Sequence, residues 1–202
     1  KLLDNLRTLL FAGHDTTAIL LAWVLELVHR HADVLARLRS ELDALDDDAP
    51  PDAYARLPYL GAVIDETLRL RPIAGDVLRP LARPLEFGPW TLPAGATIDL
   101  CPVLLHHSEA LWERPEEFMP ERFSGKAPSP AIYSPFGGGN RRCLGATFAR
   151  YEAAVVLGTL LREFEFELLG EPAQWQRGKV ILEPTSGVPL RMHARERLRQ
   201  AA

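Results

Sequence analysis

The stretch "FGGGNRRCLG", residues 136–145, places three consecutive glycines, two arginines and a cysteine within ten positions. Glycines allow a backbone to fold tightly around an object and to point N–H groups at it. After Gly145 the apolar residues recur at helical spacing as far as about Glu163, which predicts a helix. The positive end of its dipole would point at the Cys143 sulfur. Arg141 and Arg142 add positive charge. All three features stabilise a thiolate, which is the form of cysteine that binds metal.

Cys143 also has a simpler interpretation, as a small buried hydrophobic residue. The sequence has one other cysteine, Cys101, and two cysteines are too few for a disulfide framework or a four-cysteine zinc site. Their scarcity favours a reducing compartment, so we expect a cytoplasmic protein in which Cys101 is an ordinary strand residue. His106 and His107 lack the spaced partners of a metal site, and we expect them to be turn or packing residues.

Composition excludes several classes of protein. The chain has 202 residues, of which 47% are hydrophobic and 25% charged, as is usual for globular proteins. A net charge of −4 argues against a nucleic-acid partner. The longest apolar run, residues 18–25, is far shorter than the roughly 20 residues of a membrane span, so none is expected in this portion. The chain begins without methionine and inside a helical pattern, so we expect upstream sequence that could carry a signal or anchor.

Apolar periodicity predicts three helices before residue 72. The first runs from Leu2 to about His31, long enough to lie across a core, and the second from about Ala32 to Leu45. A third is expected from about Leu60 to Leu70, ending before Pro72 because the residue preceding proline is pushed out of helical geometry.

The remaining chain alternates between strand-like and irregular stretches. Residues 76–105 mix short apolar runs with proline and glycine turns, which predicts short strands. Prolines punctuate residues 113–135, and an irregular segment of that length is usually functional or specifically anchored. Strand-like alternation returns in "FEFELL", residues 164–169, and "KVILEP", residues 179–184.

The stretch "AGHDTT", residues 12–17, lies inside the first helix. Glycine costs about 1 kcal/mol relative to alanine in a helix interior, and the hydroxyl of Thr16 can capture a backbone carbonyl and bend the helix. Gly13 and Thr16 therefore predict a local kink that opens a groove, although for this stretch by itself a harmless irregularity is the simpler interpretation.

Glu66 and Arg69 are spaced i, i+3 on the third predicted helix. By itself this spacing is typical of an ordinary surface ion pair.

The cysteine loop carries a resemblance to a known family. Its residues match the pattern FxxGxRxCxG, which resembles the haem-binding signature of the cytochrome P450 superfamily; the matching residues are Phe136, Gly139, Arg141, Cys143 and Gly145. The resemblance implies that family's fold, mainly α with small β-sheets (α+β). Residues 1–202 would be the C-terminal haem-binding part of a single domain whose N-terminal half is absent.

The same resemblance assigns the loop residues to haem b. Cys143 would be the axial thiolate ligand of the iron, which favours cleavage of bound dioxygen. Phe136 would pack near the sulfur, and Arg141 would pair with a haem propionate. Gly137, Gly139 and Gly145 would shape the loop around the cofactor. The other propionate is assigned to Arg79, with Arg83 as its rival.

Two further motifs resemble those of the family. "AGHDTT" is similar to A-G-x-[DE]-T, in which the acid and the alcohol, here Asp15 and Thr16, relay protons during catalysis, while Ala12 and Gly13 leave room for the ligand. "ETLR" and "PERF" are similar to the ExxR and PERF motifs. Three of their residues would form a buried structural network: Glu66, Arg69 and Arg122.

The resemblance also implies a function. We expect a monooxygenase that activates dioxygen to hydroxylate or epoxidise a lipophilic small molecule such as a fatty acid or terpene, with electrons from a separate ferredoxin or flavoprotein reductase. Alternatives are a peroxide-using or isomerising family member, an inactive fragment, or a haem-binding sensor without turnover. Substrate contacts are expected from the first helix, from the turn after the third helix and from a hairpin tip near 185–187: Phe11, Ala12, Ile73, Ala74, Gly75, Thr185 and Ser186.

Overall fold

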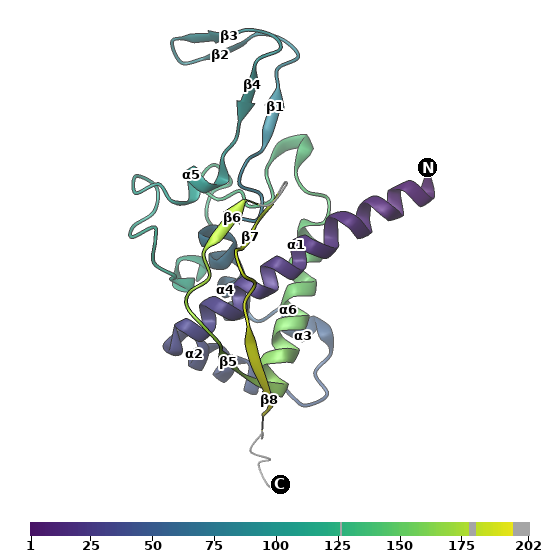
Figure 1. Ribbon diagram of the computed structural model, residues 1–202, viewed down its shortest axis with the longest axis vertical. Coiled ribbons are helices and arrows are strands. Elements are labelled where there is room, and N and C mark those ends of the chain that lie inside the picture. Colours follow the sequence, from purple (N-terminus) through teal and green to yellow (C-terminus); the bar gives the residue numbers. More distant parts are fainter. Residues whose placement is uncertain (126, 178–180, 196–202) are drawn as a thin grey trace.

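The computed structural model describes residues 1–125, 127–177 and 181–195, and its longest element is helix α1, Leu2–Arg30 (Figure 1). The two halves of α1 have different surroundings. The second half lies in the core, where Leu20, Trp23 and Val24 are buried. The first half projects from the body (Figure 1) and exposes large apolar side chains: Leu2, Leu3, Leu6, Leu9, Leu10 and Phe11. The predicted first helix is therefore confirmed, but only its second half crosses the core.

The other core helices are α2, Ala32–Asp43, α3, Pro51–Ala55, α4, Pro58–Leu70, and α6, Ala146–Glu163. Three of them, α2, α4 and α6, contact α1, and the short helix α3 packs against α6 and α4. Leu38, Leu60 and Leu157 are fully buried at the centre of this cluster. Apolar periodicity thus placed the main helices correctly, because each helix buries one face against the others.

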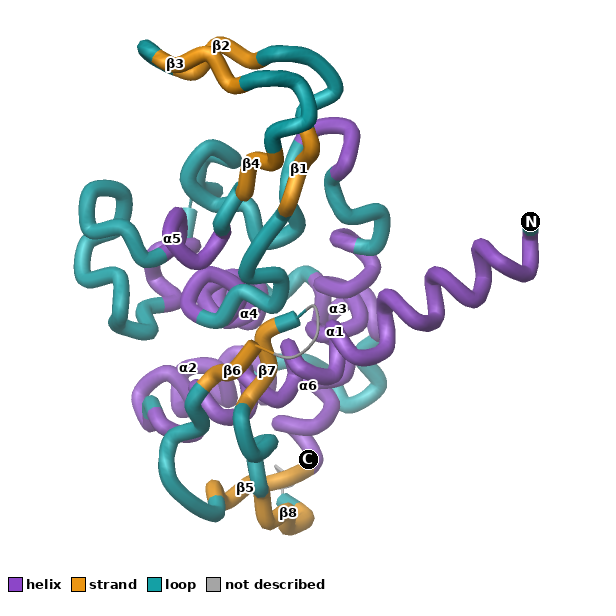
Figure 2. Tube along the Cα trace, turned by 45° about the horizontal axis from the view of Figure 1, so that its top comes forward, coloured by secondary structure: helices purple, strands orange, loops and turns teal. Residues whose placement is uncertain are grey.

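The strands among the described residues form four two-stranded antiparallel sheets. These are β1, Leu78–Pro80, with β4, Thr97–Asp99; β2, Leu85–Phe87, with β3, Trp90–Leu92; β5, Phe164–Leu168, with β8, Leu190–Ala194; and β6, Trp175–Arg177, with β7, Leu182–Pro184. Figures 1 and 2 show the β2–β3 hairpin extending beyond the helical body. The fold is mainly α with small β-sheets, as expected. Of the predicted strand "KVILEP", Lys179 and Val180 lie outside the described residues.

One predicted strand is wrong. The apolar residues after Cys101 form a short helix, α5, Pro102–His106. Pro102 stands in its first turn, where the missing N–H of proline is harmless and its fixed φ favours a helix. Cys101 therefore precedes a helix and is not a strand residue. The irregular segment that follows contains the 3₁₀ turn η1, Pro120–Phe123, and a second 3₁₀ turn, η2, Gly139–Arg141, lies in the cysteine loop.

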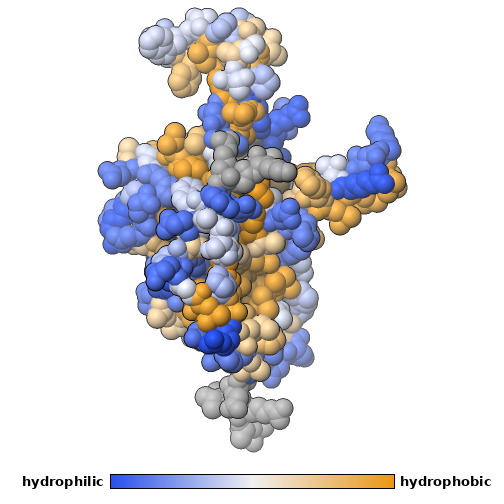
Figure 3. Space-filling model, in the orientation of Figure 1, coloured by the Kyte–Doolittle hydropathy of each residue, from blue (hydrophilic) through white to orange (hydrophobic). Residues whose placement is uncertain are grey.

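Helix α1 also bears on the expectation that this portion has no membrane span. By length and composition alone, α1 is long and apolar enough to cross a membrane, although its unbroken apolar runs are short. Core helices of soluble proteins pass the same test, and the second half of α1 is buried in the protein. Figure 3 shows apolar side chains along one side of the projecting half and polar side chains along the other.

Candidate haem-binding site

The cysteine loop closes on itself just before α6. The backbone N–H of Cys143 donates a hydrogen bond to the carbonyl oxygen of Phe136 at 2.9 Å. Gly137 and Gly139 have φ angles of 68° and 60°, in the left-handed region that favours glycine. Gly145 caps the N-terminus of α6. The loop thereby places an exposed thiol beside the positive end of an 18-residue helix.

Charge and open space surround this thiol. Phe136 is half-buried against the hydrophobic core and anchors the start of the loop. Arg141 and Arg142 are exposed, and within the described part of the chain neither side chain has a hydrogen bond or ion pair. A side-chain carbon added at Gly137 or Gly139 would meet nothing within 4 Å. The loop therefore presents a thiol, free guanidinium groups and room for a ligand.

These residues fit a haem. The cofactor needs an axial ligand for iron and cations for its two carboxylates, which Cys143 and Arg141 supply by type and by exposure. Arg79 is half-buried on β1, and one of its guanidinium nitrogens donates to the carbonyl of Leu78 at 2.8 Å. Figures 1 and 2 place the segment that contains η2 beside β1. Arg83 is exposed in the loop after β1.

The stretch 12–17 lies where α1 passes from exposed to buried. The Asp15 carboxylate is 66% exposed and pairs with Nδ1 of His14 at 2.8 Å. The hydroxyl of Thr16 donates to the carbonyl of Ala12 at 2.7 Å, which is the carbonyl capture expected from the sequence. The helix continues unbroken through this stretch, and a carbon added at Gly13 would meet nothing within 4 Å. In the described structure the side chains of Asp15 and Thr16 make no hydrogen bond to each other.

Glu66, Arg69 and Arg122 form a connected network. The Glu66 and Arg69 side chains are both 0% exposed and make two hydrogen bonds, of 2.7 and 2.9 Å. Nε of Arg122 donates to Oε1 of Glu66 at 3.3 Å, and its side chain is only 10% exposed. Buried charges are tolerated when they are paired and hydrogen-bonded, and each charge here has a partner of opposite sign.

The network also binds the irregular segment between α5 and η1. Arg69 donates to the carbonyls of His106 at 2.8 Å and Glu117 at 3.2 Å. Glu66 accepts the backbone N–H of Met119 at 2.9 Å, and Arg122 donates to the carbonyl of Arg114 at 2.7 Å. Backbone groups of this proline-rich segment are therefore hydrogen-bonded by side chains of the network, from α4 and from η1.

His106 is a packing residue, as expected. Its ring is fully buried, and Nε2 accepts the backbone N–H of Ser134 at 3.1 Å. Burial, with the nearby positive charge of Arg69, lowers the pKa of His106 to about 4. A neutral imidazole at this position holds the residues that enter the cysteine loop. His107 directly follows α5, and its Nδ1 lies 2.8 Å from Oε1 of Glu116.

The residues expected to touch substrate lie in the turn after α4, on the projecting half of α1 and after β7. Ile73 accepts the backbone N–H of Leu182 at 2.7 Å, and a carbon added at buried Gly75 would lie 2.8 Å from Leu182 Cδ1. Ala74 is half-buried between them, whereas Phe11 is exposed on the projecting half of α1. The turn after α4 therefore packs against β7.

Thr185 and Ser186 were expected at a hairpin tip and lie in a turn after β7. Thr185 donates to the carbonyl of Gln174 through its N–H and its hydroxyl, and Gly187 has a φ of 70°. Among the described strands β7 pairs with β6 and β8 with β5, so this turn does not join two paired strands. Residues 178–180, between β6 and β7, lie outside the described residues. Leu182, which faces Gly75, was not among the predicted substrate residues.

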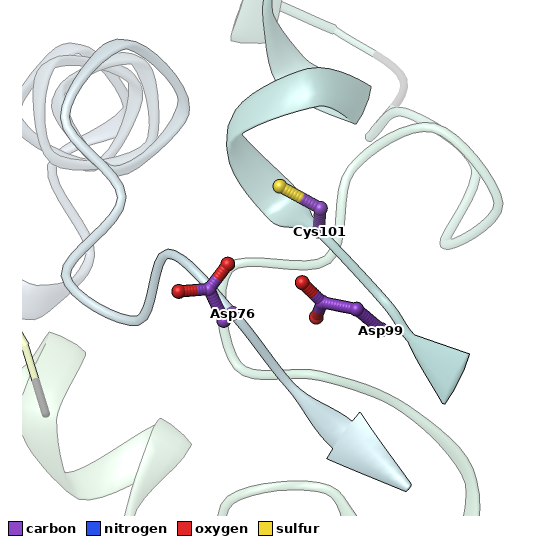
Figure 4. Close-up of side chains that lie close together, drawn as sticks. All are labelled: Asp76, Asp99 and Cys101. Carbon is purple, nitrogen blue, oxygen red and sulfur yellow. The ribbon is translucent and has the colours of Figure 1, made fainter. Parts of the chain in front are cut away.

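A group of possible metal ligands was also missed. Asp76, Asp99 and Cys101 come together at the base of the β1–β4 sheet, with ligand atoms within 4.8 Å of one another (Figure 4). Asp99 already accepts the backbone N–H of Val77 at 2.9 Å. The group combines a thiol with carboxylates that lie 23 residues apart in the sequence, so spacing gave no signal for it.

Comparisons with known proteins agree with this geometry. The family model described as Cytochrome P450 matches residues 1–190. The relative designated cytochrome P450 135B1 of Mycobacterium tuberculosis is 44% identical across 96% of this chain, and that designated cytochrome P450 137 of the same species is 40% identical across 93%. Cytochrome P450 3A5 of Homo sapiens is 36% identical across 93%. This chain spans about 40% of the length of these relatives. The chain belongs to the cytochrome P450 family.

Proposed function

We propose that this chain is the C-terminal haem-binding part of a haem-thiolate monooxygenase. The observation that carries the proposal is the exposed Cys143 thiol at the head of α6, in a loop with two unpaired arginines within the described residues. Cys143 would hold iron, Arg141 and Arg79 would hold the two propionates, and Phe136 with the loop glycines would support the porphyrin. When bound, haem b supplies the redox chemistry that activates dioxygen.

Asp15 and Thr16 would move the protons that this chemistry consumes. The Asp15 carboxylate is in contact with solvent and can exchange protons with water. The adjacent Thr16 hydroxyl has free lone pairs, although its proton is held by the Ala12 carbonyl. Proton delivery therefore requires that the hydroxyl exchanges this bond for one to the reacting oxygen. An acid and an alcohol in this order favour a monooxygenase over a member that uses peroxide or isomerises its substrate.

We further propose that the substrate is lipophilic. Phe11, Ala12, Ile73 and Ala74 offer apolar surface, and Leu182 adds to it from β7. The residues described here include no flavin or iron–sulfur motif, so a separate ferredoxin or flavoprotein reductase would supply electrons. Burial of the second half of α1 favours a core helix over a membrane span, in keeping with a cytoplasmic location.

The test uses the complete protein, expressed from its whole coding sequence and loaded with haem. Reduced ferredoxin or flavoprotein, dioxygen and a panel of fatty acids and terpenes are added, and products are identified by mass spectrometry. A monooxygenase yields product that carries one oxygen atom from labelled dioxygen. A haem-loaded protein that gives no product with any partner supports the sensor alternative. Cys143→Ser should abolish the thiolate-type carbon monoxide spectrum, and its persistence would remove Cys143 as the ligand.

A further inference from the structure

Asp65 stands next to Glu66 on α4 but has separate partners. Its carboxyl is buried, with the residue 8% exposed. The hydroxyl of Tyr133 lies 3.0 Å from both Oδ1 and the backbone oxygen of Asp65. The guanidinium of Arg150 pairs with Oδ2. Both carboxylate oxygens are therefore in use, by residues that lie 68 and 85 positions away in the sequence.

These two partners flank the cysteine loop. Tyr133 precedes Phe136 by three residues, and Arg150 follows Cys143 by seven residues, on α6. The chain therefore enters and leaves the loop at positions tied to the same carboxylate. Between these ties the loop contains glycines in the left-handed region, which restrain a backbone less than other residues do. The position of the sulfur then depends on how firmly the two ends are held.

On the entry side Tyr133 is packed among aromatic rings. Its ring packs edge-on against Phe123 at 4.8 Å and lies 5.4 Å from the ring of His106. The next residue, Ser134, donates its N–H to His106. On the exit side Arg150 is 42% exposed, so water screens its attraction to Asp65 in part. Burial raises the pKa of the Asp65 carboxyl, and Arg150 and Tyr133 act in the opposite direction.

We propose that Asp65 is a positioning residue for Cys143, because it holds Tyr133 and Arg150 and thereby fixes both ends of the loop that carries the sulfur. This inference rests on the proposed function, in which Cys143 is a metal ligand. Groups that orient a ligand from outside the coordination shell typically change metal affinity about 10- to 100-fold when mutated. Asp65 would act in this way through the backbone of the loop.

The experiment compares variants of the complete, haem-loaded protein. Asp65→Asn removes the charge that pairs with Arg150, Arg150→Leu removes the exit tie, and Tyr133→Phe removes only the hydroxyl of the entry tie. Each ferrous protein is bound to carbon monoxide and incubated at one elevated temperature, chosen so that far-ultraviolet circular dichroism shows every variant to be folded. The half-life of the thiolate-type spectrum is the readout.

We expect Asp65→Asn and Arg150→Leu to shorten this half-life about tenfold. Tyr133→Phe should shorten it less, and Arg150→Lys should restore much of the loss caused by Arg150→Leu. The matched control is Asp43→Asn, which breaks the 2.7–2.8 Å ion pair with Arg195. That pair joins α2 to the residue after β8, at the end of the molecule away from the cysteine loop (Figure 1). The control should leave the half-life unchanged.

The outcomes separate this inference from the proposed function. If the unmodified protein shows no thiolate-type spectrum, or if Cys143→Ser retains it, the proposed function fails. If that spectrum is present and depends on Cys143, but Arg150→Leu and Tyr133→Phe match Asp43→Asn, the positioning role is overturned. These two variants leave the Asp65 carboxylate in place, so the comparison stands even if Asp65→Asn does not fold.

Discussion

The Glu66–Arg69–Arg122 network and the Asp15–Thr16 pair occupy opposite kinds of surroundings. In the network every charged group is buried and bonded, and its contacts reach from α4 to residue 122. Asp15 is largely exposed, and Thr16 bonds only the carbonyl one turn before it in α1. The network shows its role in its contacts, because a buried charge without partners is strongly destabilising. The role of the exposed pair depends on groups that it does not touch here.

The largest change in the free energy of unfolding is expected when a buried charge of the Glu66–Arg69–Arg122 network is removed. Arg69→Ala leaves Glu66 buried with only the more distant Arg122 as a cation, which should cost about 3–5 kcal/mol in the free energy of unfolding. Urea unfolding of the complete protein measures it, together with haem content. The control is Arg56→Ala, which breaks the exposed ion pair with Asp52 and should change stability by less than about 1 kcal/mol. A fully haem-loaded Arg69→Ala protein of ordinary stability would contradict the network's role.

The buried region should also dominate the response to acid. The unfolded chain protonates His106 near its ordinary pKa of 6.5, but the folded chain does so only near 4. His106 therefore contributes stability above pH 6.5, and about 3 kcal/mol of it is lost as the pH falls from 6.5 to 4. Asp65 acts in the opposite direction, because burial raises the pKa of its carboxyl.

The measurement is the free energy of unfolding against pH for three proteins. His106→Gln, whose amide oxygen can still accept the Ser134 N–H, should flatten the dependence between pH 6.5 and 4. His14→Gln alters an exposed ring beside Asp15 and should follow the unmodified protein. Equal slopes in all three would show that His106 is not the group that responds.

A smaller effect is expected where α6 meets α3. A carbon added at Gly158 would lie 2.2 Å from Cδ1 of Tyr54, so Gly158→Ala forces the ring to move and should cost about 1–3 kcal/mol. Gly61 lies in α4 with nothing within 4 Å of the added carbon. Gly61→Ala is therefore expected to be neutral or to stabilise by up to about 1 kcal/mol. Thermal unfolding of both variants measures the difference in stability, and equal melting temperatures would show that the contact between α6 and Tyr54 is not tightly packed.

The smallest effect on stability is expected in the exposed pair. Thr16→Ala removes one local hydrogen bond but improves helix propensity, so the free energy of unfolding should change by less than about 0.5 kcal/mol. In the proposed monooxygenase the same change should uncouple electron consumption from product and release peroxide. Coupling is measured as product formed per reduced donor consumed. Unchanged coupling would count against the proton relay, and a large loss of stability would erase the contrast with the network.

Sequence patterns predicted the fold best for long helices, whose pattern can be recognised without knowledge of the rest of the chain. The long helices were placed to within a few residues because their apolar periodicity extends over several turns. Residues 102–106 are too short to display a period, so their helix was taken for a strand. Residues 185–187 carry typical turn residues, but the sequence alone could not show that the described strands on either side of this turn pair with other strands.

Within the candidate site, motifs identified the residues but not their contacts. The i, i+3 spacing of Glu66 and Arg69 looks the same on a surface as in a core, and only the structure shows that both are buried. The ties of Asp65 to Tyr133 and Arg150 cross dozens of residues, so no local spacing could reveal them. The carboxyl at position 65 was for this reason absent from the predicted site.

Helix α1 packs along its second half and exposes a run of large apolar side chains along its first half. Apolar surface of this extent on a helix is ordinarily covered by another packed element. Residues 12–17 lie at the boundary between the two halves, where burial starts at Thr17. An element that covered the first half would therefore end beside the acid and the alcohol and would form one wall of their surroundings.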